Sequence, residues 1–222
     1  MSKNQNPIEK MYLSSKSLLA FQESYLEKMK NNLEDAKRIN LNPLHDEILQ
    51  CRNRGGKVIA FGNGGSAANA AHFCTGISYV TRNWENPIKS ICLNQDMVLA
   101  TSLANDHGYE NIFVRQLQVL AHPDDLIVAF TVSGQSSNVV KAIEYAKTRK
   151  IKTSAFLGVL GGQTLPLVDI PIHLSSPHMV LGFTEDTHMI LCHLLAYYLE
   201  YTYSNEKNKK ARSHETSESN SN

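Results

Sequence analysis

The chain has 222 residues, of which 42% are hydrophobic and 19% charged, so it is long enough to bury one substantial core. Its 22 Lys and Arg nearly balance its 21 Asp and Glu, which gives a net charge of +1. The chain therefore lacks the excess of charge that is typical of proteins that bind nucleic acids or membrane surfaces nonspecifically. Four widely spaced cysteines without a CxxC pair, and no apolar run near the ~18 residues of a membrane span, favour a cytoplasmic protein without disulfides, zinc ribbon or membrane anchor.

The first 55 residues carry a helical pattern. It runs from residue 7 to about residue 54, and a break at residues 40–43 divides it into two expected helices. Apolar side chains recur at three- and four-residue steps, at Leu18, Leu19, Phe21, Tyr25, Leu26 and Met29. An apolar stripe on such an arm packs on the core of its own chain or on another subunit. We therefore expect residues 1–55 to serve packing and oligomerisation.

Short apolar runs alternate with helical patterns after Gly55 and Gly56. The runs cover residues 57–61, 88–93, 125–132, 152–157 and 169–174, and the helices between and after them begin near Ser66, Asn111, Ser136 and Thr184. Continuous apolar runs are typical of strands buried on both faces of a parallel sheet. The pattern predicts an α/β fold, a doubly wound three-layer sandwich of about five parallel strands, over residues 56–203.

The last residues, 204–222, contain almost no apolar side chains. Little buried surface is then available to offset the conformational entropy lost on ordering them. We expect a disordered polar tail.

A glycine-rich turn, GNGGS (62–66), follows the first expected strand and leads into a helix of small residues. Glycines allow a sharp turn there, Ser66 can cap the helix, and the free N–H groups of the helix start can face an anion. The turn has neither the GxGxxG spacing of a dinucleotide site nor the GK[ST] of a P-loop. Ordinary turn chemistry is the alternative interpretation.

A second loop of the same kind, TVSGQSSN (131–138), follows the third expected strand. Its hydroxyl groups and the start of the next helix would form a neutral phosphate cradle, which uses hydrogen bonds and the helix dipole rather than lysines. A serine-rich helix cap is the alternative. Because ligands of such folds bind beyond the carboxyl ends of the strands, two loops of this kind favour a binding site.

Four segments carry a resemblance to a known family: GNGGSAANAAHF (62–73), ANDHGYENIFVRQ (104–116), TVSGQSSNVVKAIEYAK (131–147) and EDTHMILCHLL (185–195). On these motifs, and from about residue 10 to 202, the chain resembles the sugar isomerase (SIS) domain proteins and, among them, the phosphoheptose isomerases. The resemblance implies the SIS fold and a homotetramer. Its N-terminal helices would pack at subunit interfaces, and neighbouring subunits would share active sites.

The resemblance also implies a substrate. The family converts sedoheptulose 7-phosphate into D-glycero-D-manno-heptose 7-phosphate for lipopolysaccharide or capsule sugars. Its phosphate-binding positions fall on Ser66, Thr131, Ser133 and Ser136, and its sugar-lining positions on Asn63 and Asp106. Val132 replaces a hydroxyl residue that is usual at its place, which removes one hydrogen bond of about 1 kcal/mol but leaves the cradle.

The family's zinc site places a His and, four residues later, a Glu on one helix, and a Gln and a His eight residues apart on the last helix. Those positions are His72, Gly76, Glu185 and His193 here. Because a glycine cannot abstract a proton, the base must be another group: His193, Glu185 or a metal-bound hydroxide.

We expect His72, Glu185 and His193 to be the catalytic residues and to bind zinc, as two histidines and a carboxylate with an open position. Eight residues of helix rise about 12 Å. Glu185 must therefore reach along the helix, or adjoining subunits must contribute different ligands.

Two functions follow from these residues. The first is a sugar-phosphate isomerase of the phosphoheptose type, and the alternative is a noncatalytic SIS protein, either a sugar-phosphate sensor or a tetrameric adaptor for a replication initiator. The glycine at position 76 favours the second, whereas the metal-capable pair Glu185 and His193 favours the first. We predict an isomerase with a sugar-phosphate ligand, without direct contact to nucleic acid or membrane.

Overall fold

The computed structural model describes residues 6–158, 160–175 and 180–219, with side chains described through residue 202. Five parallel strands form one sheet in the order β2-β1-β3-β4-β5. They are β1 (Lys57–Gly62), β2 (Lys89–Cys92), β3 (Leu126–Thr131), β4 (Lys152–Leu157) and β5 (Ile170–His173). Each lies within or next to a predicted apolar run, which confirms the prediction of a doubly wound parallel sheet.

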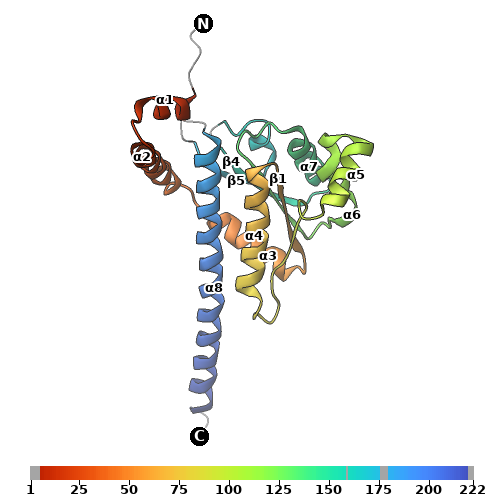
Figure 1. The fold of residues 1–222 in the computed structure, drawn as a ribbon. Coiled ribbons are helices and arrows are strands. Elements are labelled where there is room, and N and C mark those ends of the chain that lie inside the picture. The colour runs from red at the N-terminus through yellow and green to blue at the C-terminus, as the bar shows by residue number, and fades with distance from the viewer. Residues whose placement is uncertain (1–5, 159, 176–179, 220–222) are drawn as a thin grey trace.

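Helices cover both faces of the sheet and complete three layers (Figure 1). On one face lie α3 (Asn42–Asn53), α4 (Gly65–Thr81) and α8 (Leu181–Ser219), and on the other lie α6 (Ile112–Leu120) and α7 (Ser137–Thr148). Successive side chains of a strand point to opposite faces. In β3, Leu126, Val128 and Phe130 accordingly join the first core, while Ile127 and Ala129 join the second.

The N-terminal arm contains three helices rather than the two that periodicity predicted. These are α1 (Pro7–Ser14), α2 (Leu18–Ala36) and α3, and the expected break at 40–43 lies between α2 and α3. The additional break arises because Ser17 caps α2, with its hydroxyl oxygen accepting the Ala20 N–H at 3.2 Å. Met29 is buried, whereas Leu18 and Leu26 remain exposed on the arm.

One helix has no counterpart among the predicted elements. Helix α5 (Met97–His107) begins after Asp96, whose carboxylate accepts the Leu99 N–H at 2.9 Å, and none of its residues is buried. A short 3₁₀ helix, η1 (Tyr109–Asn111), follows it, and a second one, η2 (Leu165–Leu167), precedes β5. Only Leu103 and Ala104 of α5 pack, partly buried, against the second core, so the helix has little of the apolar periodicity by which the other helices are recognised.

Helix α8 continues through Ser219 and so enters the segment 204–222 for which composition predicted disorder. Residues 220–222 lie outside the described part of the chain. The segment contains Glu, Lys, Ala and Arg, which have good intrinsic helix propensity, a preference that an argument from apolar content leaves out. No helix of the described residues is both long and apolar enough to cross a bilayer.

Candidate functional site

A cavity of about 380 Å³ opens at the carboxyl ends of β1 and β3, the two neighbouring strands from which the chain continues in opposite directions. The loop after β1 leads to α4 on one face, and the loop after β3 leads to α7 on the other. This is the switch point at which open α/β sheets bind ligands. The cavity is lined by Asn63, Gly64, Gly65, Ser66, Phe130, Thr131, Val132, Ser133, Ser136, Leu181 and Glu185.

The first loop presents the start of α4 to this cavity. Gly64 has φ +57°, a left-handed conformation that glycine adopts without steric cost, and α4 begins at the next residue. Ser66 is buried, and its hydroxyl makes no hydrogen bond with another described residue. Ser66 lines the cavity, so its predicted contact with a phosphate remains a prediction that this position allows.

Glu185, the fifth residue of α8, reaches into the cavity and places its carboxylate against Gly65. The main-chain N–H of Ser66 donates a hydrogen bond to this carboxylate. Burial raises the pKa of Glu185 above its ordinary value, and the Ser66 N–H opposes this rise. The buried Asn69 fixes the helix behind it, because its side-chain amide donates to the Glu185 carbonyl oxygen at 2.9 Å.

Glu185 is the single ionisable residue among the described residues that line the cavity. A carboxyl group accepts a proton when it is ionised and donates one when it is protonated, which is what a general acid or base requires, and burial in this cavity favours its protonated form. The cavity therefore combines hydroxyl and N–H donors for an anion with one proton-transfer group.

The second loop is held in shape by its own hydroxyl groups. Thr131 Oγ1 accepts the Gly134 N–H at 3.1 Å, and Ser133 Oγ accepts the Gln135 N–H at 3.2 Å. Each hydroxyl thus keeps its hydrogen for a ligand, while the Ser136 side chain makes no cap bond to α7. The predicted phosphate-binding residues of both loops therefore line one cavity.

Gly134→Ala is expected to destabilise this loop strongly. Gly134 has φ +64°, and an added Cβ would overlap the main-chain oxygen of Gly161. The left-handed conformation costs about 1–2 kcal/mol for a residue with a Cβ, and overlap in a packed region adds about 1–3 kcal/mol. Denaturant unfolding would measure the sum. Gly64→Ala is the matched control, because Gly64 is also left-handed but has open space around it. Equal losses in the two variants would contradict the role of this close approach.

His72 and His193 lie together, with their Nε2 atoms 2.7 Å apart, on the exposed surface between α4 and α8. Glu185 does not join them, because its carboxylate lies at Ser66, and six residues of helix, about 9 Å of rise, separate Ser66 from His72. No group of three His, Cys, Asp or Glu side chains among the described residues could hold a metal ion.

The predicted zinc set of His72, Glu185 and His193 thus does not fit around one ion within a single chain. The physical reason is the helical spacing: α8 carries Glu185 toward the strand ends and His193 two turns away from them. Within one chain, Glu185 and the two loops are therefore the groups that supply the chemistry of the cavity.

Asp106, predicted to line the sugar, lies near the end of α5 and does not line the cavity. It is exposed, and its carboxylate accepts a hydrogen bond from Asn105 at 2.8 Å. In its place, Asn138 and Tyr109 contact the cavity-lining Asn63, at 2.8 and 2.8 Å. Sequence reasoning missed both residues, although they lie inside the motifs 131–147 and 104–116.

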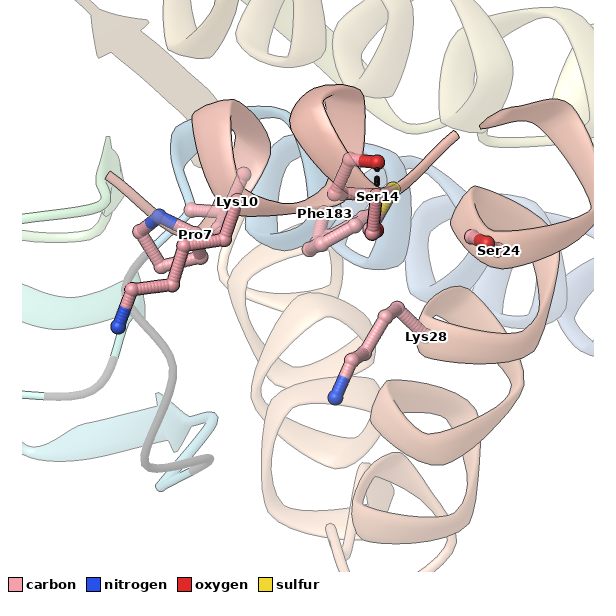
Figure 2. A pocket seen from close by; sticks show the side chains of 8 residues that line it. Pro7, Lys10, Ser14, Ser24, Lys28 and Phe183 are labelled. Carbon is pink, nitrogen blue, oxygen red and sulfur yellow. Dashed lines mark hydrogen bonds between the residues drawn. The ribbon is translucent and has the colours of Figure 1, made fainter. Parts of the chain in front are cut away.

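A larger cavity, of about 550 Å³, lies between α1, α2 and the first turn of α8 (Figure 2). Its lining is mainly apolar, with Lys10 and Lys28 at its edge. The hydroxyls of Ser14 and Ser24 already donate to main-chain carbonyls of their own helices, at 2.9 and 3.0 Å. It lies away from the strand ends, and its described lining includes no carboxylate or imidazole, so the smaller cavity is the candidate active site.

Comparison with known proteins gives concordant matches. A family model described as the SIS domain matches residues 21–158. A phosphoheptose isomerase of Thermodesulfovibrio yellowstonii is 37% identical over 155 residues, which cover 69% of this chain and 75% of that protein. A phosphoheptose isomerase of Helicobacter pylori is 31% identical over 194 residues, which cover 87% of this chain and 97% of that protein. The structure of a phosphoheptose isomerase from Neisseria gonorrhoeae aligns with a TM-score of 0.76 at 25% identity, over 83% of this chain and all of that one.

Proposed function

We propose, because this chain belongs to the SIS domain family and to its phosphoheptose isomerase subgroup, that it interconverts an aldose phosphate and a ketose phosphate. The substrate is sedoheptulose 7-phosphate, as the names of the relatives imply, and the product is D-glycero-D-manno-heptose 7-phosphate, a precursor of lipopolysaccharide or capsule sugars. One observation carries this proposal most directly: Glu185 is positioned in a cavity otherwise lined by N–H, amide, hydroxyl and apolar groups.

The phosphate lies in the second loop, where Thr131, Ser133 and Ser136 offer hydroxyl donors beside the start of α7. The sugar extends toward the first loop. Glu185 takes a proton from C1 of the ketose and returns a proton to C2, while the C2 carbonyl becomes a hydroxyl and the C1 hydroxyl becomes the aldehyde. No atom is gained or lost, and no external reductant is needed.

The bound phosphate itself favours this chemistry. A second negative charge near the Glu185 carboxylate raises its pKa further, in addition to the effect of burial. The carboxylate is then a stronger base toward the proton on C1. Position 76 is a glycine here and lacks the carboxylate of the family, so the proton-transfer role passes to Glu185, the carboxylate that lines the cavity.

We further propose a homotetramer in the cytoplasm. The apolar side chains Leu18, Leu19, Leu26, Leu194, Tyr197 and Tyr201 are more than half exposed on α2 and α8, a surface that self-association would cover. The four cysteines are all free and buried, which suits a reducing compartment. Light scattering of the purified protein tests the assembly.

An NMR assay with sedoheptulose 7-phosphate in D₂O tests the activity. We expect product formation together with deuterium at carbon, because the proton on Glu185 exchanges with solvent. Ser133→Ala is expected to raise KM about 5- to 10-fold with little change in kcat, since the phosphate contact exists in ground and transition states alike. Absence of both product and exchange, in protein that still binds the sugar phosphate, would favour the noncatalytic sensor or adaptor.

A further inference from the structure

The side chains of Asn63 and Asn138 form a reciprocal amide pair between the two loops of the candidate active site. Asn63 Nδ2 donates to Asn138 Oδ1 at 2.8 Å, and Asn138 Nδ2 donates to Asn63 Oδ1 at 2.9 Å. The hydroxyl of Tyr109 also donates to Asn63 Oδ1, at 2.8 Å. Asn138 is buried, and Asn63 lines the cavity.

The main chain determines which way both amides face. Asn138 Oδ1 accepts the N–H of Val139 at 2.9 Å, and a main-chain N–H can only donate. The oxygen of Asn138 must therefore face Val139, and the reciprocal pair then fixes which end of the Asn63 amide is oxygen. Tyr109 stabilises the same orientation, because its hydroxyl donates to that oxygen.

This arrangement leaves Asn63 with one function toward a ligand. Both lone pairs of its oxygen are occupied, by Asn138 and Tyr109, and one of its two N–H groups is bound to Asn138. The remaining N–H has no acceptor among the described residues. Asn63 can therefore only donate to a ligand, and cannot accept from a sugar hydroxyl without losing a bond.

We infer that Asn138 and Tyr109 are positioning residues that hold the Asn63 amide as a fixed hydrogen-bond donor for the sugar oxygen that becomes negatively charged in the enediolate. A donor held in advance at a developing oxyanion stabilises the transition state more than the ground state. Asn63 would touch the substrate, whereas Asn138 and Tyr109 act through it. This inference rests on the proposed isomerase function.

Tyr109 reaches Asn63 from a segment that is itself anchored to the second loop's helix. Lys141 of α7 donates to Asn111 Oδ1 at 3.3 Å and pairs with Glu110 at 3.6 Å. Lys141 thereby attaches the other two residues of η1, Glu110 and Asn111, to α7. The Tyr109 ring is otherwise exposed, so removal of its hydroxyl should leave the fold intact.

The test compares Tyr109→Phe with Tyr12→Phe, which removes the hydroxyl of an exposed tyrosine on α1. Each variant is measured for kcat and KM, and for its affinity for two ligands: inorganic phosphate, and a sugar-phosphate hydroxamate whose anionic oxygen mimics the enediolate. We expect Tyr109→Phe to lower kcat and hydroxamate affinity about 5- to 10-fold, with KM and phosphate affinity within twofold of wild type. Tyr12→Phe should change none of them.

Asn138→Asp provides a second variant. It replaces the amide nitrogen that donates to Asn63 Oδ1 with a carboxylate oxygen, and it retains the oxygen that accepts the Val139 N–H. It should lose hydroxamate affinity more than Tyr109→Phe does. Equal losses of hydroxamate and phosphate affinity would overturn the inference, as would a Tyr109→Phe variant indistinguishable from Tyr12→Phe. If wild type binds the hydroxamate selectively but does not turn over sedoheptulose 7-phosphate, the proposed substrate falls while the orientation of Asn63 stands.

Discussion

Glu185→Gln is expected to lower kcat by about 10²–10⁴-fold, the usual contribution of a general acid or base, while the sugar phosphate still binds. Gln keeps the shape of the side chain and can still accept the Ser66 N–H, but it cannot take a proton. Removing the negative charge from the cavity should also tighten the binding of inorganic phosphate. Isothermal titration calorimetry and the NMR assay measure the two effects separately.

Two further variants separate the carboxylate from its surroundings. Gly65→Ala keeps Glu185 but places a Cβ where its carboxylate now lies, so the flexible side chain must move away and turnover should fall. Asp186→Asn removes the neighbouring exposed carboxylate, which accepts a hydrogen bond from Tyr25 at 2.9 Å, and should leave kcat within about twofold. Wild-type turnover by Glu185→Gln would exclude Glu185 as the proton-transfer group.

The raised pKa of Glu185 predicts how its removal affects stability. Because the folded protein disfavours the charged form, the stability that protonated Glu185 contributes is present at low pH and is lost as the pH rises through the raised folded pKa. Glu185→Gln lacks this loss. At neutral pH, its free energy of unfolding should therefore be at least that of the wild type. The fall in rate at low pH, which protonation of Glu185 causes, should be seen in the wild-type enzyme and be absent from the variant. An inactive variant of unchanged stability distinguishes a catalytic role from a structural one.

The sheet was predictable from the sequence because its strands are buried on both faces. In β1 and β3 every residue or nearly every residue is buried, so each strand reads as a continuous apolar run. The two loops were predictable for a related reason, since parallel strands bring their carboxyl ends to one edge. Helix α5 shows the limit of this reasoning, because a helix without a fully buried residue leaves only a weak pattern.

Side-chain pairs between distant segments were beyond such reasoning. Asn63 and Asn138 are 75 residues apart, and nothing in their spacing indicates that their amides meet. The separation of Glu185 from the histidines was partly foreseeable, since eight residues of helix span about 12 Å. The orientation of the Glu185 side chain depends on two features of α4: Gly65 has no Cβ, and the Ser66 N–H lies beside the carboxylate. Both features depend on how α4 packs against α8, which the sequence does not show.

Gly76→Glu is expected to create a zinc site that the described residues of a single chain do not form. Position 76 lies one helical turn after His72, and a Cβ there would meet nothing closer than Ala196 Cβ at 3.6 Å, three residues after His193. A glutamate at this position would extend into open space beside the two histidines. Two histidines and a carboxylate, with one position open, match a catalytic zinc set.

The gain in affinity can be estimated from structural zinc sites, where four ligands contribute about 10–16 kcal/mol, or roughly 3 kcal/mol each. One added ligand should therefore raise zinc affinity about 100-fold or more, measured by competition with a chelating dye. Gly76→Ala is the matched control: it also removes a helix-interior glycine, which stabilises the helix by about 1 kcal/mol, but adds no ligand. His193→Ala in the Gly76→Glu background should abolish the gain. If Gly76→Glu and Gly76→Ala bind zinc equally, the two histidines do not face position 76, and the loss of the family's Glu would not explain the incomplete ligand set.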